Sequence, residues 1–396
     1  GKDAGQLITT GNYNVAIGLD SLESVTTGAD NTAVGYYALQ ANTGSGNTAF
    51  GRSAMAANTS GEGNAGFGYQ SLDANTTGDN NTACGYQSLT DVTTGGNNTA
   101  VGKSSASNTT TADYNTALGY QSLFTNTTGA SNTAVGKNAL VSATTASSNT
   151  ALGADAGAAL TTGANNTFIG YLSGGVGTVT GSNNTTLGSD AGKNLSSGSN
   201  NLLLGHDAGL SGSPGGPIDT ESNEIVLGDE NITAAHVQVD WTVASDKRDK
   251  TDVEPMPMGL DFVNKLEPVT YKWDKRSNYV EKGEDFNHIV PDGSHKEDWL
   301  DVGFLAQDVE KLESEYGYNI SDKSNLTTTL SDDGNQYGLK YNKFVPMLVK
   351  AVQELSAQVE ELKKNSHAPK GLTDMEGYDI LMSRIENLEK EKENGS

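Results

Sequence analysis

Small and apolar residues alternate with polar ones in a short pattern that recurs along the first half of the chain. The pattern is Asn-Thr-Ala-apolar-Gly, as in Asn98-Thr99-Ala100-Val101-Gly102. Alternation with a period of two predicts a short β-strand. The closing glycine recurs at steps of 16 to 18 residues, mostly 17, at Gly18, Gly35, Gly51, Gly68, Gly85, Gly102, Gly119, Gly136, Gly153, Gly170, Gly188 and Gly205. We therefore expect one structural unit per copy.

Each copy also carries residues suited to two chain reversals. A second short segment follows the glycine, as at Tyr120-Gln121-Ser122-Leu123, and a Thr-Gly turn follows that segment, as at Thr128-Gly129. Glycine adopts positive φ freely and asparagine tolerates it, so both corners fit the sequence. The repeat predicts one coil of a β-solenoid per copy, and at about 4.8 Å per coil twelve copies form a rod of about 60 Å.

The apolar content of one coil is low, often one alanine, one branched residue and one leucine. At about 25 cal/mol per Å² of buried apolar surface, a single thin stack of coils gains little stability. We therefore expect the chain to associate with further copies, in a three-fold arrangement. The repeats resemble the head repeats of trimeric bacterial adhesins and the β-structured stalks of phage fibres. The pattern does not distinguish self-coiled chains packed as a homotrimer from three interwound chains.

Two positions of the repeat carry side chains with possible chemistry. Cys84 occupies the position that Val101 holds in another copy, so a packed thiol is favoured over a nucleophile. The residue after the glycine is aromatic in some copies and basic in others, which indicates an exposed column. This column could stack on sugar rings, but stacking and cation–π contact between coils are favoured. Its members include Tyr36, Arg52, Tyr69, Tyr86, Lys103, Tyr120, Lys137 and Tyr171.

Composition divides the chain into three parts. The first 213 residues contain no proline, and only 5 of the 25 Lys and Arg residues precede Ser245. We expect a repetitive solenoid stalk over 1–212, a loop and β neck over 213–244, and a separate domain over 245–396. Within the neck, residues 224–228 and 236–243 are predicted as strands.

Charge and composition exclude several classes of function. A net charge of −24 argues against nucleic acid and anionic membranes as partners, because phosphate binding needs clustered Lys and Arg. No apolar run approaches a membrane span, so no membrane insertion is expected. The chain begins at Gly1 with no secretory signal, and we expect a fragment or a processed product. The histidines show no ligand spacing, so no metal and no cofactor is predicted; they are His206, His236, His288, His295 and His367.

From Ser245 onward the chain resembles the endosialidase-type intramolecular chaperone domain found at the ends of phage tail proteins. Four segments carry the resemblance in the family's order: 245–250, 266–273, 303–310 and 341–355. In that family a serine and the lysine five residues later form a dyad that cuts the chain just before the serine, after trimerisation. The resemblance implies that Ser245 is the nucleophile, that Lys250 is the general base, and that the bond between Ala244 and Ser245 is cut.

The chemistry of such a dyad sets a physical condition. A serine hydroxyl needs a base to remove its proton, and a lysine acts as a base only when it is neutral. From an unperturbed pKa of about 10.4, neutrality near pH 7 needs a depression of roughly three units, or about 4 kcal/mol, and burial is its usual source. We hypothesise that trimer closure buries Lys250. Without the downstream segments, Ser245-Asp246 followed by basic residues would be an ordinary turn or helix cap.

The last part of the chain carries an assembly pattern. Apolar residues step by three and four, as in a heptad seam, and predict a coiled-coil-like helix over about 341–364. An amphipathic helix packed on its own domain through Phe344 and Met347 is the alternative. The seam residues are Val345, Leu348, Val352, Leu355, Val359 and Leu362. Pro369 and Gly371 end this pattern, and Ile385 and Leu388 suggest a short terminal helix.

A polar run between Asp274 and Asp301 is predicted to be a loop or arm. It includes Asn278, Glu281 and His295, and in the family such arms reach onto the stalk.

These observations predict a mainly β protein with a C-terminal α+β domain, assembled as a homotrimer. The favoured function is a viral tail fibre or spike, made in the host cytoplasm and located in the virion, with a host-surface glycan or protein as candidate receptor. Its C-terminal domain would direct trimerisation and then release itself as a single-turnover serine autopeptidase acting in cis, without external substrates.

Two alternatives remain open. One is a trimeric surface adhesin or receptor-binding stalk whose C-terminal domain is structural and does not cleave. The other is a glycan-degrading spike, which needs paired carboxylates. The acids Asp155, Asp190 and Asp207 instead resemble turn residues.

Overall fold

The computed structural model describes residues 1–238, 241–280, 286–331, 334–365, 382–387 and 390. The chain forms two compact units. The first comprises residues 1–240, 273–297 and 330–336, and the second comprises 241–272, 298–329 and 337–396. Several residues named in the sequence analysis lie outside the described residues: Glu281, His367, Pro369, Gly371 and Leu388. Residues 382–387, within the predicted terminal segment, are helical.

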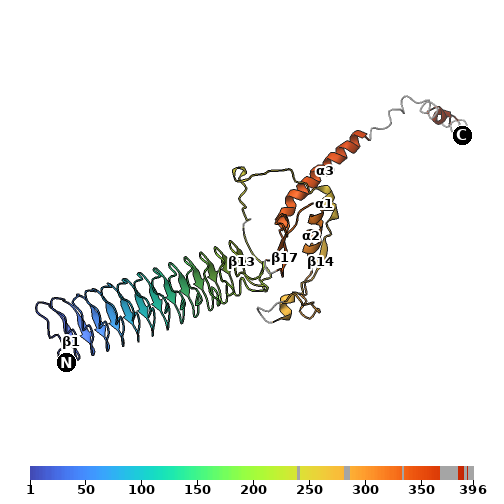
Figure 1. The fold of residues 1–396 in the computed structure, drawn as a ribbon. Coiled ribbons are helices and arrows are strands. Elements are labelled where there is room, and N and C mark those ends of the chain that lie inside the picture. The colour runs from blue at the N-terminus through green and yellow to red at the C-terminus, as the bar shows by residue number, and fades with distance from the viewer. Residues whose placement is uncertain (239–240, 281–285, 332–333, 366–381, 388–389, 391–396) are drawn as a thin grey trace. The chain divides into compact units, whose positions relative to one another are not determined.

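A β-solenoid makes up most of the first unit, as the repeat predicted. Thirteen three-residue strands of the described chain pair in parallel in sequence order, as Figure 1 shows from β1 to β13. Their bounds are β1 Val15–Ile17, β2 Thr32–Val34, β3 Thr48–Phe50, β4 Ala65–Phe67, β5 Thr82–Cys84, β6 Thr99–Val101, β7 Thr116–Leu118, β8 Thr133–Val135, β9 Thr150–Leu152, β10 Thr167–Ile169, β11 Thr185–Leu187, β12 Leu202–Leu204 and β13 Ile225–Leu227. A single chain therefore coils on itself and forms a complete stack.

A ladder of buried asparagines holds the coils in register. The backbone N–H of Asn98 donates to Oδ1 of Asn81 at 3.0 Å, and Nδ2 of Asn98 donates to the carbonyl of Ala112 at 2.8 Å. Both asparagines are at most 1% exposed. Because each amide satisfies backbone groups of neighbouring coils, the buried polar column leaves few unpaired groups. This explains why asparagine precedes nearly every strand.

The glycine that closes each strand is required by close packing between coils. Gly85 has φ of +144°, and a Cβ placed on it would lie 2.4 Å from the carbonyl oxygen of Gly102 in the next coil. No side chain fits there without moving the backbone.

The middle residue of each strand points inward, whereas the first and third residues point outward. In β5, Ala83 is fully buried and Cys84 is exposed. The prediction of a packed Cys84 thiol is therefore wrong for the single chain. The interior is filled instead by a leucine such as Leu89, which is fully buried at φ of +49°. This left-handed conformation is strained for leucine, and burial of the side chain offsets the strain.

The stack continues beyond the proline-containing loop, because β13 pairs with β12. The second strand predicted for the neck is absent: the described residues of 236–243 form no strand. Val237 and Trp241 are 53% and 74% exposed. A short alternating segment stays extended and solvated when no neighbouring strand accepts its hydrogen bonds.

The predicted polar arm lies against the end of the solenoid. Residues 273–297 belong to the first unit and include the 3₁₀ turn η2, Arg276–Tyr279. The ammonium group of Lys275 donates to the carbonyl of Glu230 at 2.5 Å, and the Arg276 guanidinium donates to the carbonyl of Asn335.

The second unit is an α+β domain. It contains the helices α1 Leu260–Lys265, α2 Ala306–Glu315 and α3 Phe344–Asn365, and the 3₁₀ turns η1 Lys247–Asp249 and η3 Tyr341–Lys343. Strands β14 Val269–Tyr271 and β15 Asp301–Gly303 pair antiparallel, and β16 Thr328–Leu330 pairs with β17 Tyr337–Leu339. The core is formed by Met258, Phe262, Val309, Leu312, Phe344 and Met347. Within the described part of the chain, no helix has the length and apolar content to cross a membrane.

Candidate functional site

A tight turn brings the two predicted catalytic side chains together. The 3₁₀ turn η1 occupies Lys247–Asp249, and the backbone N–H of Lys250 donates to the Lys247 carbonyl at 3.3 Å. This folds the segment back, so that Lys250 Nζ donates to Ser245 Oγ at 2.6 Å. A spacing of five residues thus becomes a direct hydrogen bond between the two groups.

Asp246 shapes the turn rather than joining that pair. Its carboxylate accepts from the Arg248 backbone N–H at 2.9 Å and from Arg248 Nη2 at 2.6 Å. The hydrogen bonds from Arg248 lower the pKa of the Asp246 carboxyl, and the carboxylate raises the pKa of the guanidinium. The two charges satisfy each other, which leaves Ser245 and Lys250 with one another as partners.

The surroundings of the pair are open in the single chain. Every described residue from 241 to 250 is exposed. Apolar side chains flank the pair on both sides in sequence, with Val243 70% and Val253 72% exposed. In the single chain, no part of the described structure covers Ser245 or Lys250 from solvent.

Other segments of the predicted domain pack together in the second unit. Gly303 closes β15, and a Cβ placed on it would lie 2.3 Å from the Tyr341 hydroxyl. That hydroxyl accepts from the Phe304 backbone N–H at 3.1 Å. The Phe304 and Tyr341 rings stack with their centroids 6.2 Å apart. The segments beginning at residues 303 and 341 are therefore joined by a close contact at Gly303.

The column after the repeat glycine forms a stacked ladder, as predicted. The Arg52 guanidinium lies between two tyrosine rings, 5.6 Å from Tyr36 and 5.7 Å from Tyr69. Tyr69 stacks on Tyr86 at 5.2 Å, and the ammonium group of Lys103 lies 5.7 Å from Tyr86. The aromatic faces are thus largely used between coils, which confirms the cross-coil interpretation.

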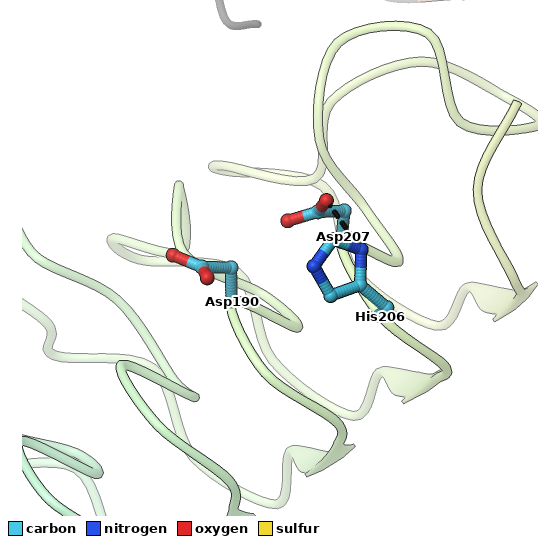
Figure 2. A group of neighbouring side chains, drawn as sticks. All are labelled: Asp190, His206 and Asp207. Carbon is cyan, nitrogen blue, oxygen red and sulfur yellow. Dashed lines mark ion pairs between the residues drawn. The ribbon is translucent and has the colours of Figure 1, made fainter.

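The structure also brings together a charged cluster that the sequence interpretation missed. Asp190, His206 and Asp207 place one ligand-type atom each within 4.8 Å of one another, and Figure 2 shows the two aspartates on successive coils beside the imidazole. The signal was present in the sequence: both aspartates follow the repeat glycine by two residues and lie 17 apart. Both have positive φ, as expected for turn residues.

Basic side chains already accompany these carboxylates. Lys193 Nζ lies 2.7 Å from Asp190 Oδ1, and His206 Nδ1 lies 2.6 Å from Asp207 Oδ2. Burial raises the pKa of the Asp190 carboxyl, but hydrogen bonds from Lys193 and Ser189 outweigh it and hold the pKa below its usual value. The cluster offers metal-type ligands, but Lys193 and His206 already lie within hydrogen-bond distance of its carboxylate oxygens.

Comparison with known proteins gives one family match. Residues 245–318 match a peptidase family described as chaperone of endosialidase. This confirms the resemblance for that part of the chain, and the match begins at Ser245 itself. No curated protein and no solved structure gives a significant match.

Proposed function

We propose that residues 245–396 act as an intramolecular chaperone that assembles three copies of this chain and then cuts itself off between Ala244 and Ser245. The released product is the solenoid of a viral tail fibre or spike in the virion. The observation that carries the proposal is the 2.6 Å hydrogen bond between Lys250 Nζ and Ser245 Oγ, at the residue where the chaperone-of-endosialidase match begins.

The cut proceeds through an ester. The neutral Lys250 amine removes the proton from Ser245 Oγ, and the oxygen attacks the carbonyl carbon of Ala244. The C–N bond between Ala244 and Ser245 breaks, and the ammonium of Lys250 returns its proton to the departing Ser245 nitrogen. Water then hydrolyses the ester, which leaves a carboxylate on Ala244 and a free amino group and hydroxyl on Ser245. Each chain performs this sequence once.

Assembly switches the cut on by removing water from the pair. Ser245 and Lys250 are exposed in the single chain, together with the flanking Trp241, Val243 and Val253. Partner copies that cover these apolar side chains also desolvate Lys250. Desolvation disfavours the charged ammonium and favours the neutral amine that the reaction needs.

Helix α3 supplies the assembly surface. Phe344 and Met347 are buried in the domain's own core, whereas the seam on the remaining face stays in solvent. Val345 is 58% exposed, Val352 61% and Leu362 67%. An apolar seam of this length with heptad spacing matches further copies of the same helix in a bundle.

Removing either member of the pair tests the proposal. The wild-type full chain should yield a fragment that begins at Ser245, as seen by denaturing gel and intact mass. Ser245→Ala and Lys250→Met should remain full length, with cleavage slowed by at least about 100-fold. Lys247→Met is the matched control, because it removes a neighbouring exposed lysine outside the pair and should still be cut.

The outcomes separate the candidate functions. Cleavage of Ser245→Ala at the same bond would refute the assignment of the nucleophile. A wild-type trimer whose chains all stay intact would favour the alternative of an adhesin or receptor-binding stalk with a non-cleaving C-terminal domain.

A further inference from the structure

One face of the solenoid sheet is apolar along its whole length. The third residue of each strand, from Ile17 in β1 to Leu227 in β13, points outward, and we call this column the apolar row. Every member is Val, Ile, Leu, Phe or Cys, and every member is exposed or half-buried. Ile17 is 58% exposed, and Phe50, Leu152 and Leu227 are 47% to 48% exposed.

The column beside the apolar row is also uncharged. The first residue of each strand shares its outward face and is threonine in most strands, as in Thr82, Thr99 and Thr116. None of the thirteen strands of the described chain contains a charged residue. A solvated sheet face normally carries polar and charged side chains as protection against association, so this face is atypical of a surface in water.

The size of the row matches a stable protein interface. Thirteen coils at about 4.8 Å each give a row of about 60 Å, and half-exposed side chains of this size leave roughly 800 to 1,000 Å² of apolar surface. The largest apolar patch on a typical monomer is about 300 to 600 Å², and a stable complex buries about 800 Å² per partner.

We propose that the apolar row packs against the same row of further copies of this chain, parallel and in register, and that this contact holds the released solenoid together. A partner must present a straight apolar column with a spacing of one residue per coil, which a second copy does. The parallel orientation rests on the proposed function, since copies joined at their C-terminal domains run in one direction.

Cys84 is a built-in reporter of this surface, because it is the one cysteine of the sequence and a member of the apolar row. In the assembled full chain, we expect its thiol to react with a maleimide at least about tenfold more slowly than in unfolded protein. Mild oxidation should link Cys84 to the same residue of another copy. The matched control is Cys84→Ala/Tyr86→Cys, which moves the thiol to the aromatic and basic column, where Tyr86 is 47% exposed. This thiol should react freely and should not cross-link.

Charge on the row provides a second measurement. Val101→Lys/Leu152→Lys places two charges on the apolar row without touching the C-terminal domain. After cleavage, light scattering should find the released solenoid as single chains. Tyr86→Lys/Tyr120→Lys adds the same charges to the other column and should release an intact assembly.

The results distinguish this inference from the proposed function. If the wild type assembles and cleaves but Cys84 reacts as fast as the Tyr86→Cys control, the row is not the interface and the inference is wrong, while the proposed function stands. If the lysine variant releases a solenoid that stays assembled, the inference is equally overturned. A wild-type chain that remains a monomer overturns both.

Discussion

At the residue scale, Glu313 is a carboxylate held wholly inside the second unit. It is 0% exposed, and Oε1 accepts from the backbone N–H of Thr327 at 2.6 Å and from its hydroxyl at 2.7 Å. Oε2 accepts from the Thr328 hydroxyl at 2.6 Å. A buried charge is tolerated when hydrogen bonds replace the lost water. Glu313 thus fixes the strand β16 to the helix α2.

Removing this carboxylate should loosen both elements. Glu313→Ala leaves the Thr327 and Thr328 donors buried without an acceptor, and we expect the free energy of local opening to fall by about 2 to 3 kcal/mol. Glu313→Gln keeps an acceptor oxygen and should lose roughly half as much. The measurement is amide hydrogen exchange of α2 and β16 in the full chain carrying Ser245→Ala, in which exchange should quicken by roughly 30- to 150-fold.

Glu315→Ala is the control for this prediction. Glu315 lies two residues further along α2, its side chain is 54% exposed, and its ion pair with Lys265 is at the surface. Exposed pairs contribute little, so protection should change by less than about 0.5 kcal/mol. Equal protection in Glu313→Ala and Glu315→Ala would contradict the role given to Glu313.

The resemblance to the chaperone family implied roles for Ser245 and Lys250, whereas nothing in the sequence pointed to Glu313. The structure joins the first two residues, five apart, through one local turn. The partners of Glu313 lie 14 and 15 residues away and meet it only through the packing of the second unit. A lone glutamate on a helix gives no sign of burial. Its partners therefore became visible only in the folded chain.

At the element scale, some solenoid coils exchange side-chain size between two interior positions. In one such coil the middle strand residue is Ala134 and the buried turn residue is Leu140. Where the strand carries Phe168, the turn positions on either side are Gly157 and Gly174. A Cβ on either glycine would lie 2.5 or 2.2 Å from the Phe168 ring. The ring occupies the space of the missing side chains.

This exchange predicts strong coupling between Phe168 and Gly157. Phe168→Ala should destabilise its coils by about 3 to 5 kcal/mol through a cavity, and Gly157→Leu should also destabilise them through a clash with the ring. Gly157 has φ of +58°, close to the +51° of Leu140, so the backbone accepts leucine there. The double variant should recover at least about 1 to 2 kcal/mol relative to the sum of the single effects.

Hydrogen exchange of the coils around β10 measures all three variants. Tyr171→Ala is the control, because Tyr171 lies in the same coil and is 53% exposed. It should leave protection unchanged. Strictly additive single effects would show that the two positions do not share one space.

At this scale the sequence determined the coil but left its two faces ambiguous. The constant step and the glycines predicted the solenoid, because each coil depends on local turns and a repeated contact. The alternation defined two faces of each strand without showing which was inside, since alanine and the third residue are both apolar. The structure shows which face is inside. A turn leucine such as Leu140, in the left-handed conformation, is buried in the interior, and the strand alanine is buried with it. For this reason a packed thiol was predicted for Cys84, which is exposed in the single chain.

At the scale of the whole molecule, the described part of the single chain carries several exposed apolar surfaces. They include the apolar row, the seam of α3, and the side chains that flank Ser245, such as Trp241 and Val243. A chain with a net charge of −24 has ample polar residues to cover its surface. Exposed apolar residues grouped in such surfaces therefore indicate contacts that one copy does not make. Val237 belongs with these surfaces, because the described residues of 236–243 form no strand in the single chain.

The seam of α3 provides the decisive test of how assembly and cleavage are linked. Leu355→Asp puts a charge at the centre of the seam, where Leu355 is 48% exposed in the single chain and contributes little to its own domain. We expect this variant to remain a folded monomer by light scattering and circular dichroism. Because no partner copy then covers and desolvates Lys250, cleavage at Ala244–Ser245 should slow by at least about tenfold.

Gln353→Asp places the same charge on an exposed polar position of the same helix. It should assemble and cut like the wild type, which separates the effect of the seam from that of added charge. A Leu355→Asp monomer that cuts itself at the wild-type rate would mean that the Ser245–Lys250 hydrogen bond is already competent in one chain. Burial would then not be the switch, and Lys250 would need another route to its neutral form.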